Sequence, residues 1–294
     1  MHINPQTVEF RYYIFDWDNN ILHMPTRIHL ERLQEDGTWG DTTVSTSMFA
    51  IVRNDTENYR PPKGDWELAF QEFRDLEGLT DQQFLTDTHA ALKPVIEGKS
   101  NPAPSFAAFR KALIEGRLFA IVTARGHHSH TIRQGVEYFI EQVLTDAERD
   151  LMMENLIAYL KLFGEHDSGM SNKQILTNYL ALNRYIGITS EQFIHRHGDI
   201  TRTLGQEEAK QVAIRDFVQH VIRILQKPEV PINRPISFGF SDDDSHNVEA
   251  VHAYIAEELA KEFPDIRFVV YDTSDPNVPE GRKIVVQGQL DLGL

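Results

Sequence analysis

Short apolar runs, each ending in a polar loop, recur along the chain. They are FRYYIF at 10–15, LFAIV at 118–122, ISFGF at 236–240 and IRFVVY at 266–271. Near-continuous apolar runs of this length predict strands that are buried on both faces of a sheet. Residues 105–116 show the i, i+3, i+4 spacing of an amphipathic helix, and Gly116 is its predicted stop. Strands that alternate with helices predict an α/β fold with a central parallel sheet.

Two stretches before residue 105 interrupt this alternation. At 28–52, IHLERL and DTTVSTSMFAIV flank Asp36-Gly37, which predicts an antiparallel hairpin. At about 54–104, Pro61-Pro62, the helix-like DWELAFQEFRDLEG and the loop signal KSNPAPS predict a small, mostly helical module. We therefore expect a core of residues 1–27 and 104–294, with residues 28–103 as an insert. A helical insertion at about 131–187 lengthens one crossover of that core.

Charge and composition exclude or disfavour several classes of partner, site and location. The 294 residues hold 29 basic and 44 acidic side chains, a net charge of −15, which disfavours nucleic acid as a partner unless a local basic patch exists. The absence of cysteine excludes disulfides, thiolate metal sites and a cysteine nucleophile. The start MHINPQTVEFRYY lacks the pattern of a signal peptide, and no apolar stretch approaches the roughly 18 residues of a membrane span. We expect a cytoplasmic protein without a membrane partner, and no pattern indicates an oligomeric state.

Acidic loops follow several of the predicted strands. In an open parallel sheet the carboxyl ends of the strands form the ligand crevice, so DWDNN, TARG and SDDDSHN are expected to converge. This would bring Asp16 and Asp18 close to Asp242, Asp243 and Asp244. An all-oxygen cluster without cysteine suits Mg²⁺.

These loops resemble the motifs of the haloacid dehalogenase-like (HAD) superfamily of aspartate-nucleophile phosphatases. YYIFDWDNN matches the first motif, a strand followed by D-x-D-x-(T/V), at Asp16 and Asp18, although Asn20 stands in the Thr/Val position. IVTARG supplies Thr123 for the second motif, a strand that ends in Thr or Ser. GFSDDDSHNVEAV resembles the acidic fourth motif. The resemblance implies a three-layer sandwich with a central parallel sheet, a Rossmannoid core.

Two assignments within the resemblance stay open. The third motif is a single lysine near a helix start, and Lys210 in GQEEAKQVAIRDFV, after the strand-like FIHRH, fits it; Lys173 in SNKQILTNYL is the alternative. Counting back from Asn247 favours Asp243 as the main metal ligand. Aligning Ser241 with the glycine of the family favours Asp242 instead.

The resemblance implies a Mg²⁺-dependent phosphohydrolase that acts on a small phosphorylated metabolite through a phospho-aspartate at Asp16. Asp18 would act as general acid and base and ligate the metal through its backbone carbonyl, while Thr123 and Lys210 would hold the phosphoryl oxygens. Mg²⁺ would be bound by Asp16, Asp18, Asp242 and Asp243. The hairpin would be the flap over the site, and the insert at about 54–104 the cap that selects the substrate.

Other interpretations remain for the same residues. The departure at Asn20 and the unmatched inserts suit a diverged binding or regulatory protein without turnover, and a nucleic-acid end phosphatase is disfavoured by the net charge. Asp16 and Asp18 are also common turn residues. At least one residue of Asp242–Asp244 is expected to cap the helix that begins near Asn247. Trp17 is expected to pack behind the loop, because successive strand residues face opposite ways.

Overall fold

The computed structural model describes residues 2, 9–75, 82–163, 169–226, 235–275, 278 and 280–286. Among them, six strands form one sheet in the order β6 (Arg184–Gly187), β5 (Phe119–Thr123), β1 (Phe10–Phe15), β7 (Ile236–Asp242), β8 (Ile266–Asp272) and β9 (Arg282–Val285). Neighbouring strands are parallel except for β9, which runs antiparallel to β8. The predicted α/β fold with a mostly parallel central sheet is therefore confirmed, as are all four predicted strands.

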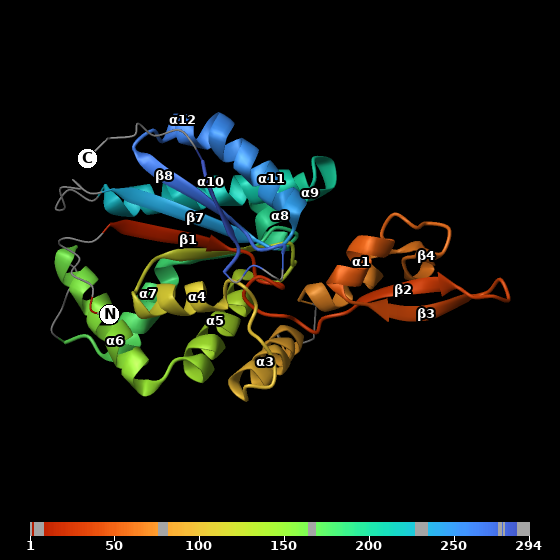
Figure 1. The fold of residues 1–294 in the computed structure, drawn as a ribbon, viewed down its shortest axis with the longest axis horizontal. Coiled ribbons are helices and arrows are strands. Elements are labelled where there is room, and N and C mark those ends of the chain that lie inside the picture. The colour runs from red at the N-terminus through yellow and green to blue at the C-terminus, as the bar shows by residue number, and fades with distance from the viewer. Residues whose placement is uncertain are drawn as a thin grey trace.

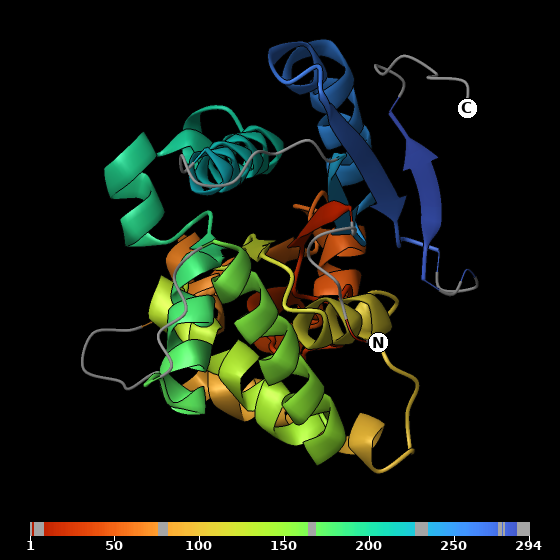
Figure 2. The ribbon, with the colours of Figure 1, turned by 90° about the vertical axis from the view of Figure 1, so that its left-hand side faces the viewer.

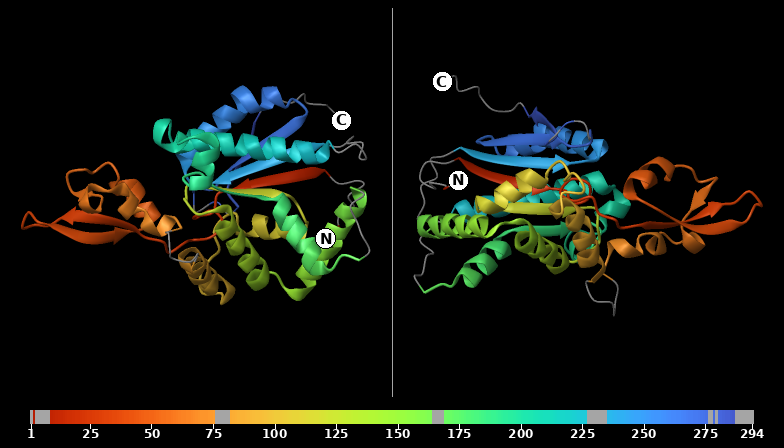
Figure 3. Two further views of the ribbon diagram at one scale, coloured as in Figure 1. Left: turned by 180° about the vertical axis from the view of Figure 1, so that it is seen from behind. Right: turned by 60° about the horizontal axis from the view of Figure 1, so that its bottom comes forward.

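Helices cover both faces of this sheet (Figures 1 and 2). One face packs against α10 (Gln206–Leu225) and α11 (Ser245–Tyr254), and the left view of Figure 3 shows α10 lying over this face. The other face packs against α4 (Phe106–Ile114), α5 (Ser129–Val143), α6 (Asp146–Leu162) and α7 (Asn172–Leu182). In β1, Tyr12 and Ile14 belong to the first core, whereas Phe15 belongs to the second, as the two-residue period of a strand requires.

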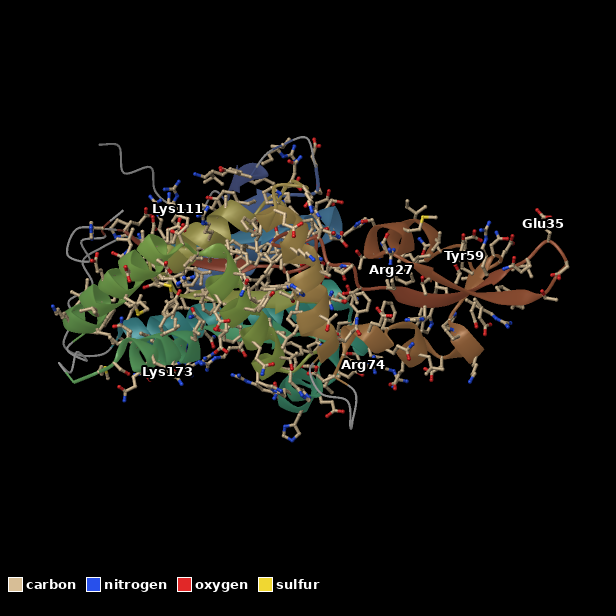
Figure 4. All side chains as sticks on the ribbon, turned by 90° about the horizontal axis from the view of Figure 1, so that it is seen from below. Arg27, Glu35, Tyr59, Arg74, Lys111 and Lys173 are labelled. Atoms are coloured by element: carbon tan, nitrogen blue, oxygen red, sulfur yellow. The ribbon has the colours of Figure 1, made fainter. Side chains whose placement is uncertain are left out.

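A second, three-stranded sheet extends beyond the carboxyl ends of the parallel strands (Figure 1). β2 (Ile28–Leu33) and β3 (Trp39–Val44) form the predicted antiparallel hairpin, and β4 (Tyr59–Arg60) pairs with the other edge of β2. The turn depends on Asp36, whose carboxylate accepts from the Thr38 amide, and on Gly37, which has a φ of 81°. Glu35 lies at the tip of this hairpin (Figure 4).

A short helix follows β3 where the second strand of the hairpin was expected to continue, and the helices after it belong to the predicted helical module. Residues of the predicted second strand fold as α1 (Thr46–Val52), because the Ser45 side chain accepts from the Met48 amide and caps the helix. The helix-like DWELAFQEFRDLEG forms only α2 (Trp66–Ala69) and the 3₁₀ turn η2 (Gln71–Phe73), and its last three residues lie outside the described ones. The long helix of the insert is α3 (Gln82–Ile96).

Two expectations for residues 131–197 were wrong. The stretch at 131–187 is not all helical, because its last residues form the edge strand β6. FIHRH is not a strand but lies in α8 (Glu191–His197), which Ser190 caps by accepting from the Phe193 amide. The remaining short elements are η1 (Pro62–Gly64), α9 (Ile200–Thr203), a π-helical turn at Ile255–Leu259 and α12 (Ala260–Glu262). No helix among the described residues combines the length and apolar character needed to cross a membrane.

Candidate functional site

Three acidic side chains meet at the carboxyl edge of the central sheet. Asp16 directly follows β1, Asp242 ends the neighbouring strand β7, and Asp243 follows it. The Asp16 amide donates to the Ser241 carbonyl (3.0 Å), which continues the pairing of the two strands into the loop. Each of the three carboxylates offers an oxygen within 4.8 Å of the others. The convergence expected from the parallel topology therefore holds for these residues.

Lys210 lies between two of these carboxylates. Its Nζ is 3.2 Å from Asp16 Oδ1 and 2.6 Å from Asp242 Oδ2, and only 2% of its side chain is exposed. The residue reaches the cluster from the first turns of α10. Lys173 instead lies exposed on α7, at the opposite end of the molecule from the hairpin (Figure 4). Of the two lysines considered from the sequence, Lys210 is the one beside the acidic cluster.

Burial and mutual repulsion govern the protonation of this cluster. Burial raises the pKa of Asp16 well above its usual range; Lys210 opposes this shift, and the carboxylates of Asp242 and Asp243 add to it. Burial and the nearby charge of Asp242 raise the pKa of Asp243 to about 7. Burial alone would lower the pKa of Lys210, but the charges of Asp16 and Asp242 outweigh it and raise that pKa. Three carboxylates thus share one ammonium group.

The same residues could hold a metal ion. Among the described residues, Asp16, Asp242 and Asp243 form a group with the spacing of metal ligands. Their donors are all carboxylate oxygens, the ligand type that Mg²⁺ and Ca²⁺ take in proteins. A divalent cation would also relieve the repulsion that one lysine leaves uncompensated. The donor chemistry and the charge therefore fit such an ion.

Asp18 is held outside this group by an arginine that the sequence analysis did not single out. Its two oxygens accept from Arg125 Nη2 (2.6 Å) and Nε (2.7 Å). Arg125 is 1% exposed, and its guanidinium lies 4.7 Å from the ring centre of Phe73 and 5.4 Å from that of Phe84. The backbone carbonyl of Asp18, expected to be a metal ligand, accepts from the Asn20 amide (2.6 Å). Arg125 lies in the TARG loop, which was expected to converge with DWDNN, but no pattern in the sequence pairs it with Asp18.

Thr26 and Asp87 extend the Asp18–Arg125 pair toward the insert. Arg125 Nη2 also donates to Thr26 Oγ1 (2.7 Å), and Thr26 in turn donates to Asp87 of α3. The Gly126 amide donates to the Phe73 carbonyl (2.8 Å). The insert therefore contacts the same loop that carries Arg125.

Asn20, the departure from the motif, has a structural explanation. It is fully buried, and its Nδ2 donates to the Asp16 carbonyl (3.0 Å) and to Ser241 Oγ (2.9 Å). Its Oδ1 accepts from Ser105 Oγ (2.7 Å) and Thr273 Oγ1 (2.9 Å). One amide thus joins the loop after β1 to β7, to the segment after β8 and to the start of α4.

The remaining residues from the sequence analysis also have defined places. Thr123 ends β5 with 1% exposure, and its Oγ1 accepts from the Arg125 amide (3.4 Å). Trp17 packs behind the loop against Phe84 and Phe109, as expected. Asp244 caps α11 by accepting from the His246 amide (2.9 Å), so one of the three consecutive acids has the expected capping role.

Comparisons with family models, curated proteins and solved structures found no match for this chain. A parallel α/β sheet by itself hosts many unrelated activities. The residues at the carboxyl edge of the sheet must therefore indicate the chemistry.

Proposed function

We propose that this chain is a Mg²⁺-dependent phosphohydrolase of the HAD type, which cleaves a small phosphorylated molecule through a phospho-aspartate at Asp16. The observation that carries the proposal is the buried Lys210 ammonium between Asp16 and Asp242, at the carboxyl ends of neighbouring parallel strands. The first, second and fourth motifs of the sequence support the same proposal, since they lie at the carboxyl ends of β1, β5 and β7 in the central sheet.

Asp16, Asp242 and Asp243 would hold the metal. When bound, Mg²⁺ would neutralise phosphoryl oxygens and keep the Asp16 carboxylate ionised. Lys210 would supply a second positive charge, and the Thr123 hydroxyl a hydrogen bond, to the same phosphoryl group. A carboxylate is a weak nucleophile, so this charge and the in-line placement of phosphorus must lower the barrier.

Asp16 would attack phosphorus with a carboxylate oxygen. The new bond from this oxygen to phosphorus forms while the bond from phosphorus to the leaving oxygen breaks, and the electron pair stays with the leaving oxygen. Water then attacks the same phosphorus, which releases inorganic phosphate and restores the Asp16 carboxylate.

Asp18 would move the protons in both steps. It would give a proton to the leaving oxygen and take one from the attacking water. Both of its oxygens accept from Arg125, so Asp18 must turn away from Arg125 before it can protonate a leaving group. Because Arg125 packs on Phe73 and Phe84 of the insert, a movement of the insert would free Asp18.

Paired substitutions at Asp16 and Asp18 test these roles. Asp16→Asn removes the nucleophile and one metal ligand, so we expect no turnover of an aryl phosphate and no phosphoenzyme. Asp18→Asn keeps the nucleophile and the metal ligand at Asp16. Phosphoryl transfer to Asp16 from a substrate with a good leaving group therefore continues, while steady-state turnover falls by about 10² to 10⁴. Asp244→Asn is the matched control, because it removes a neighbouring charge but asparagine still caps α11. Full activity of Asp16→Asn would refute the proposal.

The Asp18–Arg125 ion pair also favours a second candidate function. If the pair never opens, the chain would bind a phosphorylated ligand at Lys210 without consuming it. A panel of phosphorylated metabolites, tested with Mg²⁺ for both binding and phosphate release, separates the two. Phosphate release that Asp16→Asn abolishes would eliminate the binding protein.

A further inference from the structure

A cavity of about 430 Å³ lies beside the edge strand β6, apart from the candidate site. Its walls come from β6, from the first turns of α5, from α8 and from the second half of α10. None of the acidic residues at the carboxyl edge, nor Lys210 or Thr123, is among the residues that line it. The volume falls within the range of about 300–1,000 Å³ typical of small-molecule sites.

The lining of this cavity is strongly basic. It includes the arginines Arg133, Arg184, Arg196 and Arg223 and the histidines His130 and His220. Among the described lining residues, the single carboxylate is Asp216. Its Oδ2 already lies 3.2 Å from Arg196 Nη2 and 3.1 Å from His197 Nε2. Arg133 is paired with Glu137 (2.8 Å) outside the lining. Positive charge therefore exceeds negative charge around the cavity, although the whole chain has a net charge of −15.

Arg184 is fixed in position without a carboxylate partner among the described residues. Its Nη2 donates to His220 Nδ1 (2.7 Å), and its Nη1 donates to the Asn183 carbonyl (3.1 Å). The other ring nitrogen of His220 donates to the Leu182 carbonyl (2.7 Å). His220 is thus held as the tautomer that accepts from Arg184. The guanidinium is therefore oriented before any ligand arrives, which lowers the entropy cost of binding.

The arginines also repel one another. Burial, and then the charges of Arg196 and Arg223, lower the pKa of Arg184, and the charge of Asp216 offsets this only in part. A single charged residue is enough to protect an edge strand from pairing with another chain, so edge protection does not account for four arginines around one cavity. Their mutual repulsion would be relieved by a bound anion.

We propose that the arginine-lined cavity beside β6 binds a small anion that carries two or more phosphate or carboxylate groups. The planar guanidinium fork matches the oxygens of both groups, and among the described residues neither Arg184 nor Arg223 forms a hydrogen bond or ion pair with a carboxylate. The limited volume and the acidic rest of the molecule favour a small anion over a nucleic acid. This site is separate from the proposed phosphohydrolase site and does not depend on it.

Calorimetric titration with pyrophosphate and with citrate, both in a buffer freed of divalent cations by a chelating resin, tests the proposal. The proteins are the wild type, Arg184→Gln, Arg223→Gln, Asp16→Asn and Arg267→Gln. Arg267→Gln removes the same charge from an exposed position on β8, outside the cavity. Arg223 is exposed, so its substitution leaves the fold intact even if Arg184→Gln unfolds the chain.

We expect one probe or both to bind the wild type, and added salt to weaken the binding. Arg184→Gln and Arg223→Gln should each weaken it by about tenfold or more, because each removes a charge-assisted hydrogen-bond donor. Asp16→Asn and Arg267→Gln should bind as the wild type does, and the tighter probe identifies the preferred group. Equal binding by all five proteins, no binding of either probe at millimolar concentration, or binding of oligonucleotides alone would overturn the proposal.

Discussion

Asn20 shows how a single buried amide can define the candidate site. The loop after β1 makes a sharp turn, and Asn19 within it has a φ of 53°. Asn20 then directs its amide into the space between β7, β8 and α4, where it uses both its donor and its acceptor atoms. A threonine or valine at this position could not form these bonds, because neither side chain offers an amide.

Replacement of Asn20 by alanine should therefore destabilise the fold. Asn20→Ala leaves the hydroxyls of Ser105, Ser241 and Thr273 without their buried amide partner, and we expect a loss of about 3 kcal/mol in the free energy of unfolding. Denaturant titration measures it. Asn101→Ala, at an exposed loop position, should change the free energy by less than about 0.5 kcal/mol. Equal stabilities of the two variants would mean that the network around Asn20 contributes little.

His127 is a second residue whose burial has a measurable consequence. It is 1% exposed, its ring packs against Phe84, and its Nε2 faces Arg125 Nη1 at 3.4 Å. Its Nδ1 lies 3.4 Å from Asp75 Oδ1. Burial, and then the charges of Arg125 and His128, lower the pKa of His127 to about 3. The folded protein therefore keeps this imidazole neutral in mildly acidic solution.

The lowered pKa of His127 predicts a loss of stability in acid. Between pH 6.5 and 3 the unfolded chain binds a proton that the folded chain excludes, so stability is full above pH 6.5 and falls as the pH falls. At pH 5 this costs about 2 kcal/mol relative to neutral pH. We expect His127→Gln to show a flatter decline over the same range in denaturant titrations. A decline as steep as that of the wild type would assign the acid sensitivity to other groups.

At the scale of elements, the strands in the middle of the sheet were the most predictable. β1, β5, β7 and β8 are buried on both faces, so their apolar runs are nearly continuous in the sequence. The edge strands β6 and β9 have four residues each and carry Arg184, Arg282 and Lys283, so no apolar run marks them. FIHRH has the residues of a strand, but the Ser190 cap and the neighbouring turn make it helical.

The candidate site was also predictable in one part and not in another. Topology brings the ends of β1 and β7 together, so the meeting of Asp16 with Asp242 and Asp243 could be predicted. The partner of Asp18 could not, because Arg125 reaches it through a loop that folds back against Phe73 of the insert. Long-range packing of this kind leaves no periodic pattern in the sequence.

The contact of α3 with α5 gives a prediction at this scale. A methyl group on Gly135 of α5 would lie 2.6 Å from Cε1 of Phe84 and 3.4 Å from Cζ2 of Trp17. Alanine in a helix gains about 1 kcal/mol over glycine, whereas overpacking costs about 1–3 kcal/mol. We expect Gly135→Ala to lower the free energy of unfolding by about 1 kcal/mol, since overpacking is the larger effect. Phe84→Leu in the same chain should recover part of the loss.

Gln142→Ala is the matched control, because it places alanine on the exposed face of the same helix. It should leave stability unchanged or raise it slightly. If Gly135→Ala raised stability as well, α3 would be free to shift away from α5.

At the scale of the molecule, a bound cation would reduce the repulsion among the negative charges of the folded chain. The chain has a net charge of −15, and three of its carboxylates are crowded at one edge of the sheet around Lys210. Self-repulsion of this kind destabilises a compact state. The three-stranded sheet extends from the same edge (Figure 3), and Arg125 contacts both Phe73 of the insert and Asp18 of the loop after β1.

Mg²⁺ should therefore stabilise the whole fold. A ligand that binds only the folded state at 100 times its dissociation constant adds about 2.7 kcal/mol, and the acidic cluster forms only when β1 and β7 are paired. We expect the melting temperature of the wild type to rise from EDTA to Mg²⁺. Asp242→Asn should abolish this rise, because it removes one carboxylate charge from the cluster. Asp244→Asn changes the residue next to the cluster, still allows capping of α11, and should keep the rise. A rise of equal size in Asp242→Asn would place the stabilising ion elsewhere on the protein.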